Sequence, residues 1–229
     1  MYRLIYLFVA LLLLVPMVMG GCVDQEEEPA LPEKPVEEPV SPEKPDPSDD
    51  VQPWTEANQL EPEKPTILII EGMEEELTLH LHVSSINPYA IYLDQERYRV
   101  EEGDNKDIIM FDTEAEIPEV SMAIWHREDI EVSQLAAELE NQLKEQYTKV
   151  THHGRVESPL PAQYIYVEKG DSWDDTVVRY YLVEDFNGGV FVVQQIMFLE
   201  AVEGHGVRFD GILEEFFIWD FEKGEFFRP

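Results

Sequence analysis

The chain has 229 residues, 49 acidic and 16 basic side chains, a formal net charge of −33 and a single cysteine. This charge argues against binding of nucleic acid or of an anionic membrane surface, because both require basic patches, and it favours cationic partners, metal ions or simple solubility. The length leaves room for one domain of ordinary size, and one cysteine excludes a disulfide within the chain.

The first 22 residues have the architecture of a secretory signal. Arg3 supplies a positive charge, the apolar run 4–18 follows it, and small residues precede Cys22. The run is shorter than the roughly 20 residues that span a bilayer, and acidic residues rather than a basic stop-transfer cluster come next. A plain cleaved signal peptide and an uncleaved anchor are the alternatives that this pattern leaves open.

The segment Met19-Gly20-Gly21-Cys22 resembles the lipobox of bacterial lipoproteins. The resemblance implies that residues 1–21 are removed and that Cys22 becomes a lipidated N-terminus, carrying a diacylglyceryl thioether and often an added acyl chain such as palmitate. It also implies an extracytoplasmic protein held at a bacterial cell membrane by this lipid anchor. Two or three acyl chains anchor a protein stably, whereas one does so only marginally.

The composition changes sharply behind Cys22. Residues 23–65 contain 10 of the 16 prolines and 14 acidic residues, and Pro-Glu-Lys-Pro recurs at 32–35, 42–45 and 62–65. Such a segment buries too little apolar surface to offset the entropy of ordering it. Residues 22–65 are therefore predicted to be a disordered, extended tether, and residues 66–229 to form the globular domain.

Strand patterns dominate the predicted domain. Leu77, Leu79, Leu81 and Val83 alternate with polar residues, which is typical of a half-buried strand. Turn signals at 103–105 and 187–189 indicate hairpins. Further strands are predicted at 66–70, 89–93, 98–102, 108–111, 120–126, 164–168, 176–184 and 190–198.

Two helices interrupt the strands. The range 132–150 places Leu135, Leu139 and Leu143 on one stripe. A second helix is predicted over 202–218, although its glycines weaken its start. This order predicts an α+β fold, a mainly antiparallel β-sheet flanked by helices.

The strand 89–93, the helix 132–150 and the closing stretch Phe191-Val192-Val193-Gln194 through Gly206 resemble the Mog1/PsbP-like fold. That fold is an α/β/α sandwich in which a long strand runs directly into the last helix. The resemblance covers about residues 74–219, with 66–83 as an added hairpin or edge strand. It implies an accessory or binding protein, and it supplies no catalytic residues because the family shares none.

Two groups of residues are candidate metal sites. His80 and His82 lie at i and i+2 of a predicted strand, so both imidazoles face one side, a spacing that can present two zinc ligands. Glu200, Glu203 and His205 lie where the longest strand meets the last helix and could bind a metal or act in acid–base chemistry. An exposed histidine pair and a plain strand–helix junction are the alternatives.

Two other segments contain polar or aromatic residues of interest. The range 171–175 is predicted to be an acidic turn without the EF-hand pattern of calcium sites, and its Trp173 is a candidate interface anchor. His152 and His153 are predicted to lie in a loop after the first helix.

The motifs of common nucleophilic and nucleotide-binding sites are absent from the sequence. The leading interpretation is a non-enzymatic accessory or binding module, without a cofactor, that engages an envelope protein or another ligand. The second is an envelope lipoprotein that binds a divalent metal such as zinc or calcium, and the third is a hydrolase.

Overall fold

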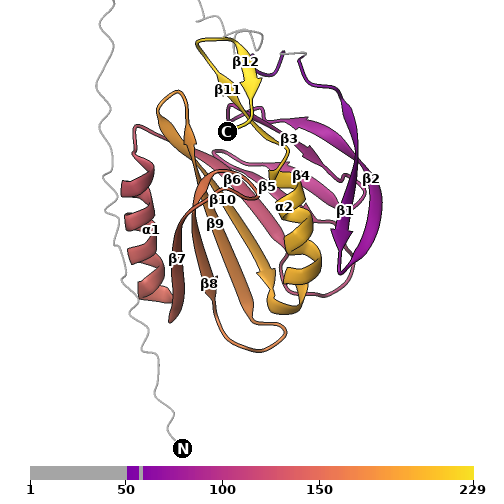
Figure 1. Cartoon of the computed structure of the whole chain (residues 1–229), viewed down its shortest axis with the longest axis vertical. Coiled ribbons are helices and arrows are strands. Elements are labelled where there is room, and N and C mark those ends of the chain that lie inside the picture. Colours follow the sequence, from indigo (N-terminus) through magenta and orange to yellow (C-terminus); the bar gives the residue numbers. More distant parts are fainter. Residues whose placement is uncertain (1–50, 57–58) are drawn as a thin grey trace, which may run out of the picture. The chain divides into compact units, whose positions relative to one another are not determined.

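A computed structural model describes residues 51–56 and 59–229. The predicted signal, Cys22 and most of the predicted tether lie outside the described residues. The described residues form two antiparallel sheets with two α-helices (Figure 1), which confirms the predicted α+β, mainly antiparallel class. In this part of the chain, no helix is both long enough and apolar enough to cross a membrane.

The smaller sheet joins the beginning and the end of the described chain. One of its C-terminal strands pairs with a strand near residue 90 through the register Phe216↔Ile91. The order across this sheet is β1 (Glu63–Ile70), β2 (Met73–Val83), β3 (Tyr89–Leu93), β11 (Phe216–Asp220) and β12 (Glu225–Phe227).

The larger sheet has seven strands and contains the longest apolar strand, β10, at its centre. Its order is β4 (Tyr98–Glu102), β5 (Asp107–Phe111), β6 (Ser121–Glu128), β10 (Gly189–Phe198), β9 (Thr176–Asp185), β8 (Ala162–Glu168) and β7 (Lys149–Val156).

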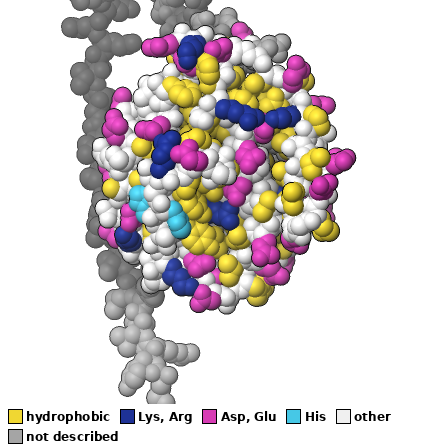
Figure 2. Space-filling model, in the orientation of Figure 1, with side chains coloured by type: hydrophobic (Ala, Val, Ile, Leu, Met, Phe, Trp, Pro, Cys, Tyr) yellow, Lys and Arg dark blue, Asp and Glu magenta, His cyan; other side chains and the backbone are white. Residues whose placement is uncertain are grey.

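Two apolar cores hold these layers together. Helix α1 (Val132–Gln146) covers one face of the larger sheet, where Leu135 and Leu143 belong to the same cluster as Leu182. The other face packs against the smaller sheet and α2 (Val207–Leu213). Full burial of each large apolar side chain in these cores is worth about 1.5–3 kcal/mol. Figure 2 shows hydrophobic side chains gathered between β8 and α2, with acidic side chains spread around them.

The predicted loop around His152 and His153 is wrong, because residues 149–156 form the edge strand β7. Helix α1 ends at Gln146, four residues before its predicted end. Alternate residues of β7 are only half buried, so the strand lacks the apolar run that would identify it. His152 Nδ1 lies 2.8 Å from Glu140 Oε2, and His153 stacks on Tyr164 with ring centroids 5.2 Å apart.

The predicted helix 202–218 is also partly wrong. A 3₁₀ turn (Leu199–Ala201), a π-helical turn (Val202–Gly206) and α2 follow β10 directly, but helical structure ends at Leu213. The next residues, Phe216-Phe217-Ile218-Trp219, are aromatic and β-branched, which favours a strand. Because β3 offers a free edge to pair with, they form β11.

The folded region begins earlier than residue 66. Strand β1 starts at Glu63 and pairs with β2 as the predicted edge hairpin. Trp54 is only 6% exposed, and its Nε1 donates a hydrogen bond of 2.8 Å to the Ser84 carbonyl oxygen. An indole buries a large apolar area when its N–H finds a partner, so this segment of the predicted tether belongs to the domain.

Candidate functional site

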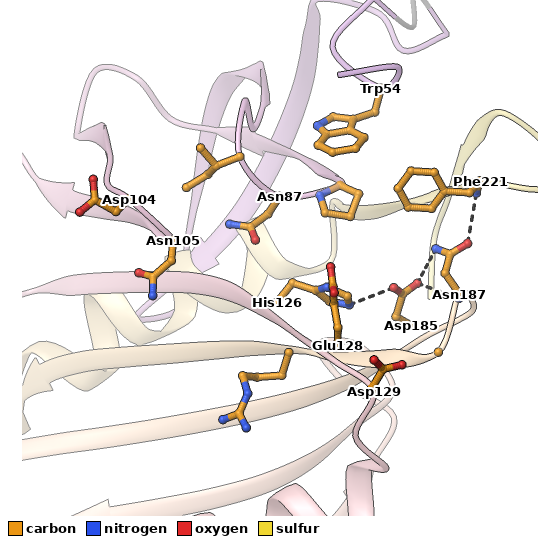
Figure 3. A pocket seen from close by; sticks show the side chains of 14 residues that line it. Trp54, Asn87, Asp104, Asn105, His126, Glu128, Asp129, Asp185, Asn187 and Phe221 are labelled. Atoms are coloured by element: carbon orange, nitrogen blue, oxygen red, sulfur yellow. Dashed lines mark hydrogen bonds and ion pairs between the residues drawn. The ribbon is translucent and has the colours of Figure 1, made fainter. Parts of the chain in front are cut away.

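Five connections between strands and helices meet at one end of the domain, drawn uppermost in Figure 1 and called here the loop end. They surround a cavity of about 740 Å³, which lies in the range of small-molecule sites, roughly 300–1,000 Å³. Figure 3 shows the cavity. Its lining residues are Trp54, Ile86, Asn87, Pro88, Asp104, Asn105, His126, Arg127, Glu128, Asp129, Asp185, Asn187, Gly188 and Phe221.

A buried histidine and a buried aspartate meet in this cavity. His126 Nε2, near the end of β6, lies 3.0 Å from Asp185 Oδ2 at the end of β9, and their side chains are 10% and 1% exposed. The two groups are not aligned for a hydrogen bond. Asp185 Oδ1 accepts hydrogen bonds from Asn187 N at 3.1 Å and Asn187 Nδ2 at 2.8 Å, so the hairpin turn fixes the carboxylate.

The hairpin also makes room for the imidazole. A Cβ atom at Gly189 would lie 2.8 Å from His126 Nε2 and 2.7 Å from the Arg127 carbonyl oxygen. On its other side the His126 ring packs against Phe191, with centroids 4.5 Å apart. The position of His126 therefore depends on a glycine at residue 189.

The cavity is acidic and contains amide groups. Carboxylates of Asp104, Glu128, Asp129 and Asp185 line it, against one guanidinium, that of Arg127. The Nδ2 atom of Asn87 is buried without a hydrogen-bond partner among the described residues. Phe221 is 51% exposed, and its ring meets Trp54 edge-on at 5.8 Å.

A second group lies at the same end. His82, Glu102 and Asp107 each offer a ligand atom, and the three atoms lie within 4.8 Å of one another. His82 is the next-to-last residue of β2, Glu102 is the last residue of β4 and Asp107 is the first residue of β5. Glu102 is paired directly with Asp107 across β4 and β5. Among the described residues, no other set of three or more His, Cys, Asp or Glu side chains converges this closely.

Hydrogen bonds orient both carboxylates of this group. Tyr89 Oη donates to Asp107 Oδ2 at 2.6 Å, and Asp107 is fully buried. Ser85 Oγ donates to Glu102 Oε2 at 2.6 Å. Asp107 Oδ1 and His82 Nε2 have no hydrogen-bond partner in the described part of the chain. Burial lowers the pKa of His82 even though Asp107 and Glu102 act in the opposite direction.

The structure does not bring the predicted site residues together as expected. Of the histidine pair, only His82 joins the converging group, while His80 Nδ1 lies 3.6 Å from Glu63 Oε1. Glu200 and Glu203 are exposed. His205 is half buried instead, and its Nδ1 lies 2.8 Å from Tyr98 Oη.

The predicted interface residue remains a surface feature. Trp173 is 59% exposed, and its ring meets Phe198 edge-on at 6.1 Å. It lies in the turn between β8 and β9, outside the residues that line the loop-end cavity.

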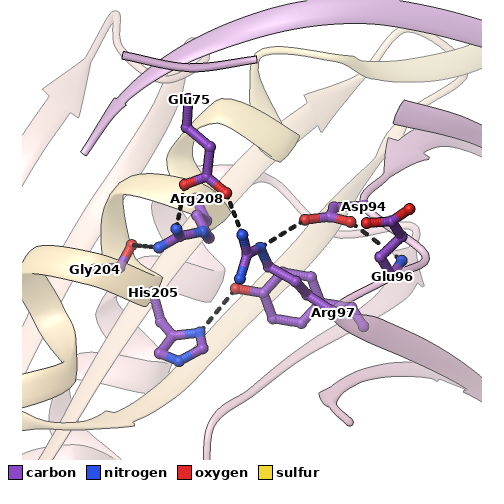
Figure 4. A network of polar contacts seen from close by, with 8 residues as sticks. Glu75, Asp94, Glu96, Arg97, Gly204, His205 and Arg208 are labelled. Carbon is purple, nitrogen blue, oxygen red and sulfur yellow. Dashed lines mark hydrogen bonds and ion pairs between the residues drawn. The ribbon is translucent and has the colours of Figure 1, made fainter. Parts of the chain in front are cut away.

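A charged network near His205 serves a structural purpose (Figure 4). Glu75 of β2 forms ion pairs with both Arg97 and Arg208, and Arg97 Nε lies 3.0 Å from Asp94 Oδ2. Burial alone would raise the pKa of Glu75, but Arg208 and Arg97 outweigh it and lower that pKa. The network ties α2 to the smaller sheet, and its charges are directed at one another.

Residues of the loop end were missed by sequence reasoning because they are far apart in the chain. The missed residues are Asn87, Glu102, Asp107, His126 and Asp185. The one local signal was the pair of predicted turns at 103–105 and 187–189, whose flanks contain Glu102, Asp107 and Asp185. Comparison of the chain with protein-family models, with curated proteins and with solved structures finds no match.

Proposed function

We propose that this protein is a lipid-anchored, extracytoplasmic binding protein whose loop end takes a small polar ligand that carries a positive charge. Cys22 supplies the anchor, and the proline-rich segment behind it holds the acidic domain away from the membrane. We infer a binding role rather than a catalytic one, in keeping with the accessory and binding functions that the Mog1/PsbP-like resemblance implies.

One observation carries this proposal. Seven buried side-chain atoms in the described residues lack a hydrogen-bond partner, and three of them belong to residues that line the cavity: Asn87 Nδ2, His126 Nε2 and Asp185 Oδ2. The last two lie 3.0 Å apart without the alignment of a hydrogen bond. Each such atom costs about 1–3 kcal/mol, so native proteins keep only a few. A cluster of them is expected where a ligand supplies the missing partners.

The cavity's chemistry selects the ligand class. Four carboxylates against one guanidinium favour a cation, and the overall charge of −33 would raise the local concentration of cations. The exposed face of Phe221 can contact an organic ammonium group. Asn87 Nδ2 is a donor and needs an acceptor, so the best fit is an amine that also bears hydroxyl groups.

We also propose that the domain is a variant of the Mog1/PsbP-like fold. Helix α1 lies between β6 and β7 and covers one face of the larger sheet, and β10 continues directly into the 3₁₀, π and α2 stretch. The second sheet departs from a simple α/β/α sandwich. A non-catalytic binding role agrees with the accessory functions that this resemblance implies.

Glucosamine and glucose form a matched pair of probes for the ligand class, because they differ in the charged amino group. We expect glucosamine, but not glucose, to raise the melting temperature of the full chain and to perturb its tryptophan fluorescence, to which Trp54 in the cavity lining contributes. Phe221→Ala should weaken this effect, whereas Trp173→Ala, at an exposed aromatic residue outside the cavity, should not. Equal effects of the two sugars would rule out recognition of charge, and no effect of either would rule out this ligand class.

The anchor is tested separately at Cys22. We expect the wild-type chain, expressed in a bacterium, to incorporate labelled palmitate and to fractionate with membranes. Cys22→Ser should abolish both properties. Membrane retention without label in the wild type would instead support an uncleaved N-terminal anchor.

A further inference from the structure

We propose that His82, Glu102 and Asp107 form a zinc site that is separate from the ligand cavity. Each of the three residues offers one ligand atom, and these atoms lie within 4.8 Å of one another. We assign the donors to the unpartnered atoms His82 Nε2 and Asp107 Oδ1 and to one oxygen of Glu102. None of the three residues lines the cavity, so the inference stands whether or not the amine ligand is correct.

Two of the proposed donor atoms are buried and lack hydrogen-bond partners in the described chain. Asp107 is fully buried, and its Oδ1 accepts no hydrogen bond within the described chain. His82 Nε2 is likewise buried and 3.9 Å from Glu102 Oε1, too far for a hydrogen bond. A cation between these atoms would satisfy both at once.

The negative charge at this group of residues is not compensated by a basic side chain of the described domain. Glu102 and Asp107 bring two carboxylates together, and no Lys or Arg in residues 51–56 or 59–229 forms an ion pair with either one. Elsewhere in the described domain, the buried Asp94 is paired with Arg97 and the buried Asp220 with Lys223. Buried charges in proteins are normally paired or bound to a metal.

Neighbouring hydroxyl groups hold both carboxylates in place by hydrogen bonds. Tyr89 donates to the second oxygen of Asp107 and Ser85 to the second oxygen of Glu102, each at 2.6 Å. Metal-binding carboxylates are characteristically oriented by such outer hydrogen bonds. The arrangement leaves one oxygen of Asp107 and a lone pair of Glu102 to face His82.

The donor set favours zinc over calcium. Zinc binds imidazole nitrogen and carboxylate oxygen in four-coordinate sites that can keep one position open, whereas calcium takes about six to eight oxygen ligands. Tetrahedral zinc bonds of about 2.0–2.1 Å require the donor atoms to move closer together. Glu102, whose side chain is 35% exposed, is the residue with freedom to make that movement.

The test is a titration of the full chain, purified with chelator and then freed of it, with Zn²⁺ and with Co²⁺ in at least 0.15 M salt. We expect one Zn²⁺ per chain, a rise in melting temperature on binding, and the absorption bands of tetrahedral Co²⁺. His82→Ala and Asp107→Asn should each weaken zinc binding by tenfold or more. Less than about a tenth of a zinc ion per chain at saturation would overturn the proposal.

A chain of this acidity can collect divalent ions without a site, so the matched control is His80→Ala. His80 lies two residues before His82 on the same strand but outside the converging group. Its replacement should leave the zinc affinity and the Co²⁺ spectrum unchanged, and an equal loss in both variants would overturn the proposal. If Asp107→Asn fails to fold, Glu102→Gln serves in its place, because Glu102 is partly exposed.

Discussion

The imidazole of His126 lies between Asp185, whose Oδ2 is 3.0 Å from its Nε2, and the ring of Phe191. This places a nearly buried histidine–carboxylate pair in the lining of the acidic cavity (Figure 3). The pair exists only because the β9–β10 hairpin presents a glycine where any side chain would collide with the imidazole.

Gly189→Ala should therefore destabilise the protein by about 1–3 kcal/mol. The added Cβ would lie 2.7 Å from the Arg127 carbonyl oxygen, so backbone must shift. Gly204→Ala is the control, because its Cβ would meet only Arg208 at 3.7 Å and alanine favours helix. Urea unfolding measures both free energies, and a neutral Gly189→Ala would contradict the packing described here.

Removing Trp54 should show that the domain begins before residue 66. Trp54→Ala is expected to cost about 3 kcal/mol, since the indole is buried and its N–H is bonded to Ser84. A chain truncated to start at Thr66 should be less stable than one that starts at Val51, because it also loses the pairs Glu63↔His80 and Lys64↔Leu79. Equal melting temperatures for the two truncated chains would instead support a domain that begins at residue 66.

Stability should fall as the pH drops from about 6.5 to 4, in part through His205. Burial, together with Arg208 and Arg97, lowers the pKa of His205 from 6.5 to about 4. The unfolded chain therefore takes up a proton in this window while the folded chain does not, and protonation favours unfolding.

The variant His205→Gln keeps an acceptor for Tyr98 Oη but cannot titrate. We expect a shallower dependence of the unfolding free energy on pH between 6.5 and 4 than in the wild type. Contributions from His82, whose pKa is also lowered, are present in both proteins and cancel in the difference. Identical slopes would show that His205 titrates normally in the folded state.

Glu75→Gln should destabilise the domain by about 1–2 kcal/mol, because it removes the shared partner of Arg97 and Arg208. The loss should shrink in high salt, which screens the partly exposed pairs. Since the folded pKa of Glu75 is lowered, its contribution is present above the unfolded pKa near 4.5 and disappears as the pH falls further. The exposed neighbour Glu76→Gln is the control and should have little effect.

The periodicity of apolar residues predicted most of the strands and the first helix. Strands β3 and β4 have the predicted bounds, and β5, β8, β9 and β10 extend them by one or two residues. Each of these elements buries one or both of its faces, so apolar side chains recur along its sequence at a regular spacing. The same reasoning missed β7, β11 and β12, where pairing with a neighbouring edge rather than an apolar pattern decides the structure.

Spacing along the sequence predicted the strands better than it predicted which side chains converge in a site. The spacing of His80 and His82 predicts a shared site, yet the residues that converge on His82 in the structure are Glu102 and Asp107. Glu200, Glu203 and His205 are close in sequence, but the 3₁₀ and π-helical turns give them separate surroundings. Neighbours in sequence share a site only when the local backbone directs their side chains to one point.

The sequence by itself determined the strand-rich α+β class and the acidic character of the chain, because composition and short-range periodicity are local properties. The lipidation of Cys22 remains a prediction from the resemblance of residues 19–22 to a lipobox. Only the tertiary structure decided the loop end. It placed His82 beside Asp107 and His126 beside Asp185, pairs that are 25 and 59 residues apart in the chain. Contacts between residues so distant in sequence depend on sheet order and register, which are fixed by the packing of the whole domain.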